Sequence, residues 1–145
     1  MNFENCNKKN LVKRIKLDKK RARSLILTSN LKEITENKIP FNNINKIAKI
    51  SLRYDVLREL LEALAILNGY KIYNHECYSA FLKEILKQDK LAQIFNQVRL
   101  VRNSINYYGK SYTTEESLNV LENISISITK VKNLINKQNF SNIKC

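Results

Sequence analysis

The sequence predicts an all-α fold, arranged as an up-and-down four-helix bundle with a basic N-terminal arm. The 145 residues include only two glycines and one proline, too few turn-forming residues for a protein of many short strands. Hydrophobic residues make up 43% of the chain, enough for one core, and they recur at helical steps of three and four. We therefore divide the chain into an arm (1–17), a helical bundle domain (18–137) and a C-terminal tail (138–145).

The first long helix is expected over residues 19–37. Asp18 is a suitable N-cap, and Pro40 prevents the helix from continuing. The apolar stripe expected to face the core consists of Ala22, Leu25, Ile26, Leu31 and Ile34. The spacing of this stripe is less regular than that of the later helices.

The second helix has the strongest periodic pattern in the chain. We expect it to start at a cap formed by Asn42 or Asn43 and to end at Asn68, because Gly69 suits the left-handed conformation that terminates many helices. Its apolar positions recur at steps of three and four. They are Ile47, Ile50, Tyr54, Leu57, Leu61 and Leu64.

Three further helices follow. A short one is expected over 75–87 after a cap at Asn74, and a long one after Asp89 that ends at Gly109. The sequence at 113–116, Thr-Thr-Glu-Glu, is typical of a capping box that begins the final helix. The apolar positions of the last two helices are Leu91, Ile94, Val98, Val101, Ile105 and Tyr108, then Leu121, Ile124, Ile128, Val131 and Ile135. Short connections between long helices favour antiparallel neighbours.

The chain is strongly basic. It has 26 Lys and Arg against 13 Asp and Glu, a formal charge of +13, and residues 1–23 contribute nine basic and two acidic side chains, or +7. This concentration favours an arm that binds a polyanion such as nucleic acid. The alternative is a solvated, lysine-rich end that only keeps the protein soluble.

Several classes of site and location are disfavoured. The chain has no glycine-rich phosphate loop, no paired cysteines at metal-ligand spacing and a single histidine, so neither a metal nor a cofactor is expected. No apolar run approaches the length of a membrane span, and the N-terminus shows no secretory signal. Three widely spaced cysteines fit a reducing compartment. A cytoplasmic location without membrane attachment is therefore expected.

The candidate functional residues lie near the end of the helix that follows Asp89. Arg99, Arg102, Asn103 and Asn106 are three or four positions apart, so they share one face, which we call the polar strip. Guanidinium groups suit phosphate, amides hydrogen-bond to bases or sugars, and tyrosine rings stack on bases. The candidate RNA- or nucleotide-binding residues are Arg99, Arg102, Asn103, Asn106, Tyr107 and Tyr108.

A second set of residues on the preceding long helix is a candidate support for the strip. Tyr54, Arg58 and Glu62 are spaced four apart and share a face. They either contact the strip or form an intrahelical ion pair beside a packed ring. A structural role is open for the strip as well, because Arg102 can pair with Glu59 or Glu62 of the neighbouring helix.

Two stretches carry a resemblance to a known family. Residues 54–81, with the run Leu-Arg-Glu-Leu-Leu-Glu-Ala-Leu and the sequence Gly-Tyr-Lys-Ile-Tyr-Asn-His-Glu, resemble HEPN domains of the archaeal type. Residues 102–109, Arg-Asn-Ser-Ile-Asn-Tyr-Tyr-Gly, do so too, and the resemblance extends over 18–137. It implies a four-helix bundle that forms a homodimer. It also implies a role with RNA, or as the partner of a minimal nucleotidyltransferase in a toxin–antitoxin type system.

The chain departs from the family at one position. Members commonly have an arginine followed after four to six residues by a histidine, and two such motifs of a dimer form a metal-independent RNase site. Arg102 matches the arginine, but Tyr107, Tyr108 and Gly109 occupy the histidine positions. The only histidine, His75, is 27 positions away at the start of another helix. It either serves that helix start or approaches the strip in the folded protein.

Three functions remain in competition. The first is a non-nucleolytic protein that binds RNA or a nucleotide, or that docks a nucleotidyltransferase. The second is a metal-independent endoribonuclease, with Arg102 on the scissile phosphate and Asn106, Tyr107 or a displaced His75 in place of the missing group. The third is a helical assembly protein in which the strip is structural.

Overall fold

The computed structural model describes residues 1–138, and these are predominantly helical. The all-α prediction is confirmed at this level. The elements in chain order are α1 (Phe3–Lys8), β1 (Val12–Arg14), α2 (Lys19–Lys38), α3 (Lys46–Leu67), β2 (Tyr70–Ile72), α4 (His75–Ala80), the π-helix η1 (Phe81–Ile85), α5 (Asp89–Tyr108) and α6 (Thr114–Asn136). None of the described helices has the length and apolar character that crossing a membrane requires. The predicted tail, 138–145, lies outside the described residues except for Gln138.

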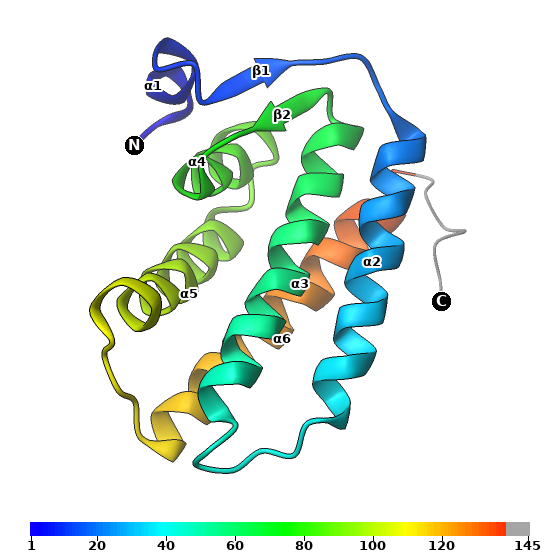
Figure 1. The fold of residues 1–145 in the computed structure, drawn as a ribbon. Coiled ribbons are helices and arrows are strands. Elements are labelled where there is room, and N and C mark those ends of the chain that lie inside the picture. Colours follow the sequence, from blue (N-terminus) through cyan, green and yellow to red (C-terminus); the bar gives the residue numbers. More distant parts are fainter. Residues whose placement is uncertain (139–145) are drawn as a thin grey trace.

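Helix α3 is the centre of the structure. It packs against α2 along most of its length and also contacts α5 and α6, while α4 packs on α5. Figure 1 shows α3 between α2 on one side and α5 on the other, with α6 crossing behind it. The sites of interest are therefore built around a helix that has neighbours on several sides.

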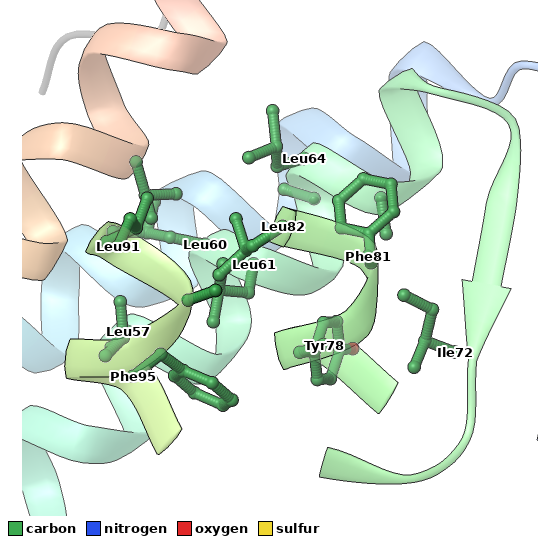
Figure 2. Packing of buried hydrophobic residues seen from close by; sticks show 14 of the residues in the cluster. Leu57, Leu60, Leu61, Leu64, Ile72, Tyr78, Phe81, Leu82, Leu91 and Phe95 are labelled. Atoms are coloured by element: carbon green, nitrogen blue, oxygen red, sulfur yellow. The ribbon is translucent and has the colours of Figure 1, made fainter. Parts of the chain in front are cut away.

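Helix α3 buries more of its surface than the single apolar stripe that the sequence predicts. Val56, Leu60 and Ala63 lie off that stripe, yet each is at most 1% exposed. A helix that is apolar on most of its surface is typical of a core position. Leucines of α3 meet Phe81 and Phe95 in the core shown in Figure 2.

The predicted helix ends are largely confirmed. The Asp18 carboxylate accepts the Arg21 amide at 2.9 Å, and the Asn74 side chain accepts the Glu76 amide at 2.8 Å. Both reciprocal hydrogen bonds of the capping box at 113–116 are present. Gly69 and Gly109 have φ of +82° and +61°, the left-handed conformation in which glycine has no Cβ to strain.

Two elements differ from their predicted form. Helix α3 begins at Lys46, because the Asn42 side chain accepts two amides of the preceding loop instead of capping the helix. The expected helix over 75–87 ends its α-helical part at Ala80 and continues as a π-turn, closed by a 3.2 Å bond from the Leu86 amide to the Phe81 carbonyl. Local capping residues do not reveal either change.

The expected stripe of α2 is only half correct. Ala22 and Ile26 are buried, but Leu31 is 63% exposed and Ile34 is 47% exposed. The inner face of the helix instead continues through the wholly buried Ser29 to a buried glutamate, Glu36. Polar side chains at core positions weaken the apolar period, which is why the sequence pattern was irregular here.

Glu36 is accommodated by two cations of α3. Its carboxylate lies 2.5 Å from Arg53 Nε and 3.6 Å from Lys49 Nζ, and the Glu36 and Lys49 side chains are 2% and 7% exposed. A buried charge is tolerated when it is paired and hydrogen-bonded. These three side chains therefore join α2 to α3. Because Lys49 and Arg53 are paired with Glu36, they are not available to a ligand.

The N-terminal residues are not a separate arm. Phe3, Cys6 and Val12 are buried, and β1 pairs with β2 in an antiparallel ladder that places Lys13 opposite Lys71. Figure 1 shows α1 and β1 lying over α4 and β2 at one end of the molecule. The predicted arm, 1–17, thus carries basic side chains on a segment that is folded onto the helical domain.

The cysteines differ from expectation. Cys6 and Cys77 form a disulfide between α1 and α4 across a sequence separation of 71, and both side chains are 0% exposed. The wide spacing that suggested unpaired thiols is overcome by the fold, which brings the two elements together. The expectation of unpaired cysteines is therefore wrong for Cys6 and Cys77, and cysteine usage no longer supports a reducing compartment.

The disulfide gives a direct prediction. The unfolded, unreduced protein should expose one free thiol, since two of its three cysteines are paired. Replacing Cys6 and Cys77 by serine should lower the free energy of unfolding by about 4 kcal/mol, because the loop between them is long. Thiol titration in denaturant and urea unfolding measure the two effects. Three reactive thiols in protein purified under air would contradict the pairing.

Candidate anion-binding site

Three side chains from three helices meet at the candidate site. Tyr54 of α3 is wholly buried, and its hydroxyl lies 3.2 Å from Nδ1 of His75 at the start of α4. The guanidinium carbon of Arg102, on α5, lies 5.2 Å from the centre of the Tyr54 ring. The fold thus brings the only histidine of the chain beside the predicted strip.

The rings of Tyr54, Phe95 and Tyr78, which we call the aromatic floor, pack together beneath the polar groups and hold them in place. The Tyr54 ring stacks on Phe95 at 6.2 Å, and Tyr78 meets Phe95 edge-on at 6.3 Å and His75 at 6.3 Å. Phe95 precedes Arg102 by seven positions, two helical turns, so both project from the same side of α5. Tyr78 and Phe95 are labelled in Figure 2, where they lie side by side in the core. Rigid rings therefore support the polar groups.

Arg102 has no carboxylate partner within residues 1–138. Its Nε is buried and has no hydrogen-bond partner among the described residues. Neither suggested structural partner forms an ion pair with Arg102: Glu59 is paired with Lys32 and Glu62 with Arg21, Arg58 and Lys71. The hypothesis that Arg102 pairs with Glu59 or Glu62 is therefore wrong. A guanidinium left without a carboxylate is available to an exogenous anion.

Glu62 binds the cations around it instead. Its carboxylate lies 2.7 Å from Lys71, 3.2 Å from Arg21 and 3.7 Å from Arg58. Burial by itself raises the pKa of a carboxyl, but the hydrogen bonds and charges of Lys71 and Arg21 outweigh it and hold the pKa of Glu62 below its ordinary value. Of the predicted supporting residues, Glu62 thus anchors Arg58 beside the site, and Tyr54 forms its floor.

The electrostatics of the site favour a neutral imidazole. Burial lowers the pKa of His75, and the positive charges of Arg58, Arg102 and Arg99 lower it further, against a smaller opposing effect of Asp55. We call these three arginines the arginine cluster. Because the pKa of His75 is depressed, the ring is uncharged at neutral pH and can accept a proton.

Tyr54 is held in its neutral form. Burial raises its pKa to about 12, and the arginine cluster opposes that rise. Its hydroxyl therefore remains protonated and able to hydrogen-bond with His75 at physiological pH. Which of the two groups donates depends on the imidazole tautomer. In either case the contact sets the orientation of the ring.

The other candidate binding residues of α5 do not all lie beside Tyr54 and His75. Arg99 donates two hydrogen bonds to the Asn96 side chain, at 2.7 and 3.2 Å, and it lies near enough to affect both Tyr54 and His75. The other four candidates show no hydrogen bond or ring contact with Tyr54, Phe95 or Tyr78. Asn103 is half-buried, Asn106 is exposed, and Tyr107 and Tyr108 are 71% and 83% exposed near the end of α5.

Sequence reasoning found the arginines but not the complete site. The periodicity of α5 placed Arg99 and Arg102 together, and Tyr54 and Arg58 were chosen by their spacing on α3. The floor residues Phe95 and Tyr78 were not selected, because nothing local distinguishes them from other core aromatics. The start of α4 at Asn74 was predicted, but the approach of His75 to Tyr54 of α3 was not.

The cluster is suited to binding an anion without a metal. Three arginines around a buried ring supply planar donors for phosphate oxygens, and the uncharged imidazole adds a proton acceptor. Within the described part of the chain, no group of three or more His, Cys, Asp or Glu side chains is placed to hold a metal ion. The anion would contact the cations directly.

The electrostatic account predicts how His75 titrates. Removing the charge of Arg102 by Arg102→Ala should raise the pKa of His75, because a nearby cation that disfavours the imidazolium is lost. Titration followed by NMR of the single imidazole measures this. The exposed Lys130 on α6 provides a charge-matched control, and Lys130→Ala should leave the His75 titration in place. A pKa that falls or stays constant in Arg102→Ala would contradict the proximity.

The depressed pKa also sets a pH dependence. The unfolded chain binds a proton at His75 near its ordinary value of 6.5, whereas the folded protein resists it. This contribution to stability is thus complete above that pH and is lost as pH falls toward the folded pKa.

Comparison with known proteins found no matching family model, no similar curated protein and no similar solved structure.

Proposed function

We propose that the protein binds RNA, or a nucleotide, through phosphate oxygens held by the arginine cluster. One observation carries this proposal: Arg102 lies over a buried tyrosine ring, and in the described part of the chain it has no carboxylate partner and no acceptor for its Nε. A buried donor without an acceptor is costly, and the guanidinium nitrogens other than the buried Nε are the ones that an incoming phosphate could contact. The guanidinium geometry suits two phosphate oxygens at once.

The charge of the whole chain supports a polyanionic ligand. The formal charge is +13; the basic residues of positions 1–17 are carried on a segment that packs on β2 and α4, and those of positions 19–23 begin α2. Neutralisation of phosphates by such cations releases bound counterions and strengthens binding at low salt. A nucleic acid uses both the cluster and this surrounding charge, whereas a small anion uses only the cluster.

The family resemblance supports finer parts of the proposal. We propose that the long helices α2, α3, α5 and α6 form a HEPN-like bundle, that two copies associate as a homodimer, and that the protein acts without cleaving RNA. A minimal nucleotidyltransferase is the proposed protein partner, as in toxin–antitoxin pairs. A cytoplasmic location belongs to the same proposal. The full burial of the Cys6–Cys77 bond shields it from the thiols that reduce disulfides there.

Binding is tested with a short single-stranded RNA at low salt. Arg102→Ala should weaken it by roughly tenfold or more, since a charge-assisted contact to phosphate is lost. Lys130→Ala, which removes the same charge from α6, should weaken it much less. Fluorescence anisotropy measures both affinities, and circular dichroism shows that the variants remain folded. Equal affinities for the wild type and Arg102→Ala would refute the site, and no binding by the wild type would refute the function.

A metal-independent endoribonuclease is the second candidate function. The observation that favours it is the neutral His75 held beside Tyr54 and the arginine cluster. The imidazole would take the proton of a ribose 2′-hydroxyl while the 2′ oxygen attacks phosphorus and the bond from phosphorus to the 5′ oxygen breaks. The imidazolium would then return the proton to the leaving 5′ oxygen. The products are a 2′,3′-cyclic phosphate and a 5′-hydroxyl.

Cleavage separates the two candidate functions. If the protein is an RNase, end-labelled RNA should be cut in the presence of a chelator, and His75→Ala should abolish cutting while RNA binding persists. The activity should decline at acidic pH, because protonation of His75 removes the base. RNA that stays intact with wild-type protein, while binding is retained, would leave the non-nucleolytic function and exclude this one.

A further inference from the structure

A groove adjoins the arginine cluster. It has a volume of about 740 Å³ and runs between the N-terminal residues, α4, η1 and the first half of α5. Arg99 is part of its lining and also acts on the charge of His75 and Tyr54. One end of the groove therefore coincides with the edge of the cluster. A ligand whose phosphate lies at the cluster can extend into the groove.

Part of the groove is acidic. Glu76 and Glu84 line it, and their carboxylates repel the phosphates of a polynucleotide. Glu84 already accepts the Phe3 amide at 2.8 Å, and Glu76 lies 3.6 Å from the Met1 amine with 39% of its side chain exposed. Glu76 thus retains acceptor capacity toward the groove. This part of the groove suits a neutral group that donates hydrogen bonds.

The facing wall offers polar groups without aromatic rings. Gln93 is exposed on α5, and Asn96 uses its carbonyl oxygen to hold Arg99, which leaves its amide NH₂ free to donate. The π-turn of η1 buries Phe81 and Leu82 while Lys83 and Glu84 line the groove. Recognition in this groove would rely on hydrogen bonds at an edge of the ligand, because its lining contains no ring on which a base could stack.

Resting on the proposed function, we infer that the groove receives a nucleobase of single-stranded RNA whose phosphate lies on Arg99 and Arg102. A carboxylate accepts from the exocyclic amino group of cytosine, and a glutamine pairs with adenine. Uracil has no exocyclic amino group. The groove therefore selects adenine or cytosine over uracil, with Glu76 as the acceptor and Gln93 on the opposite wall. The volume is in the range of small-molecule sites.

The test compares short oligomers of adenylate, cytidylate and uridylate. Wild-type protein should bind adenylate or cytidylate roughly tenfold more tightly than uridylate, the discrimination expected of a good base contact. Glu76→Gln should reduce that preference without weakening uridylate binding, because it also removes a charge that repels phosphate. Glu122→Gln, an exposed carboxylate on α6, is the matched control and should retain the preference. Because Glu76 also contacts the Met1 amine, Gln93→Ala serves as a second variant, expected to weaken adenylate binding alone.

The outcomes separate this inference from the function on which it rests. Equal affinity of the wild type for all three oligomers, with loss of binding in Arg102→Ala, would refute the base pocket and leave the phosphate site in place. Equal weakening of every oligomer by Glu76→Gln would also refute base selection. No binding of any oligomer by the wild type would overturn the proposed function itself.

Discussion

The buried ring of Tyr54 is the constraint on which the candidate site depends. It is wholly buried on α3, stacks on Phe95 of α5, bonds to His75 of α4 and lies under Arg102. One side chain thus fixes the relative positions of three helices and of the polar groups they carry. Because rigid helices hold the site, its geometry is set by core packing before any ligand binds.

The distribution of charge explains why this site remains cationic. Each buried glutamate of the interior is already matched with cations: Glu36 with Lys49 and Arg53, Glu59 with Lys32, and Glu62 with Arg21, Arg58 and Lys71. These glutamates form ion pairs with other cations and not with Arg102. Of the arginine cluster, Arg58 is paired with Glu62, whereas none of these buried glutamates pairs with Arg99 or Arg102, so the cluster keeps a positive field.

The sequence predicted the features that depend only on residues close together in the chain, which are the helix caps and the helix-ending glycines. The caps at Asp18, Asn74 and 113–116 and the left-handed glycines follow from local chemistry, and all were confirmed. The bond between Cys6 and Cys77, the pairing of β1 with β2 and the approach of His75 to Tyr54 depend on how distant segments pack, and no local pattern contains them. The exposed Leu31 shows the same limit, because an apolar stripe does not reveal which of its positions has a neighbour.

The central claim is that a phosphate bound by the arginine cluster lies beside His75. The most direct test is the pKa of His75, measured by NMR with and without a saturating single-stranded oligonucleotide. A bound phosphate places negative charge near the imidazole and offsets the arginines, so the pKa should rise on binding. An oligonucleotide that binds but leaves the His75 pKa unchanged would place its phosphates elsewhere, on the basic N-terminal segment, and would contradict the account.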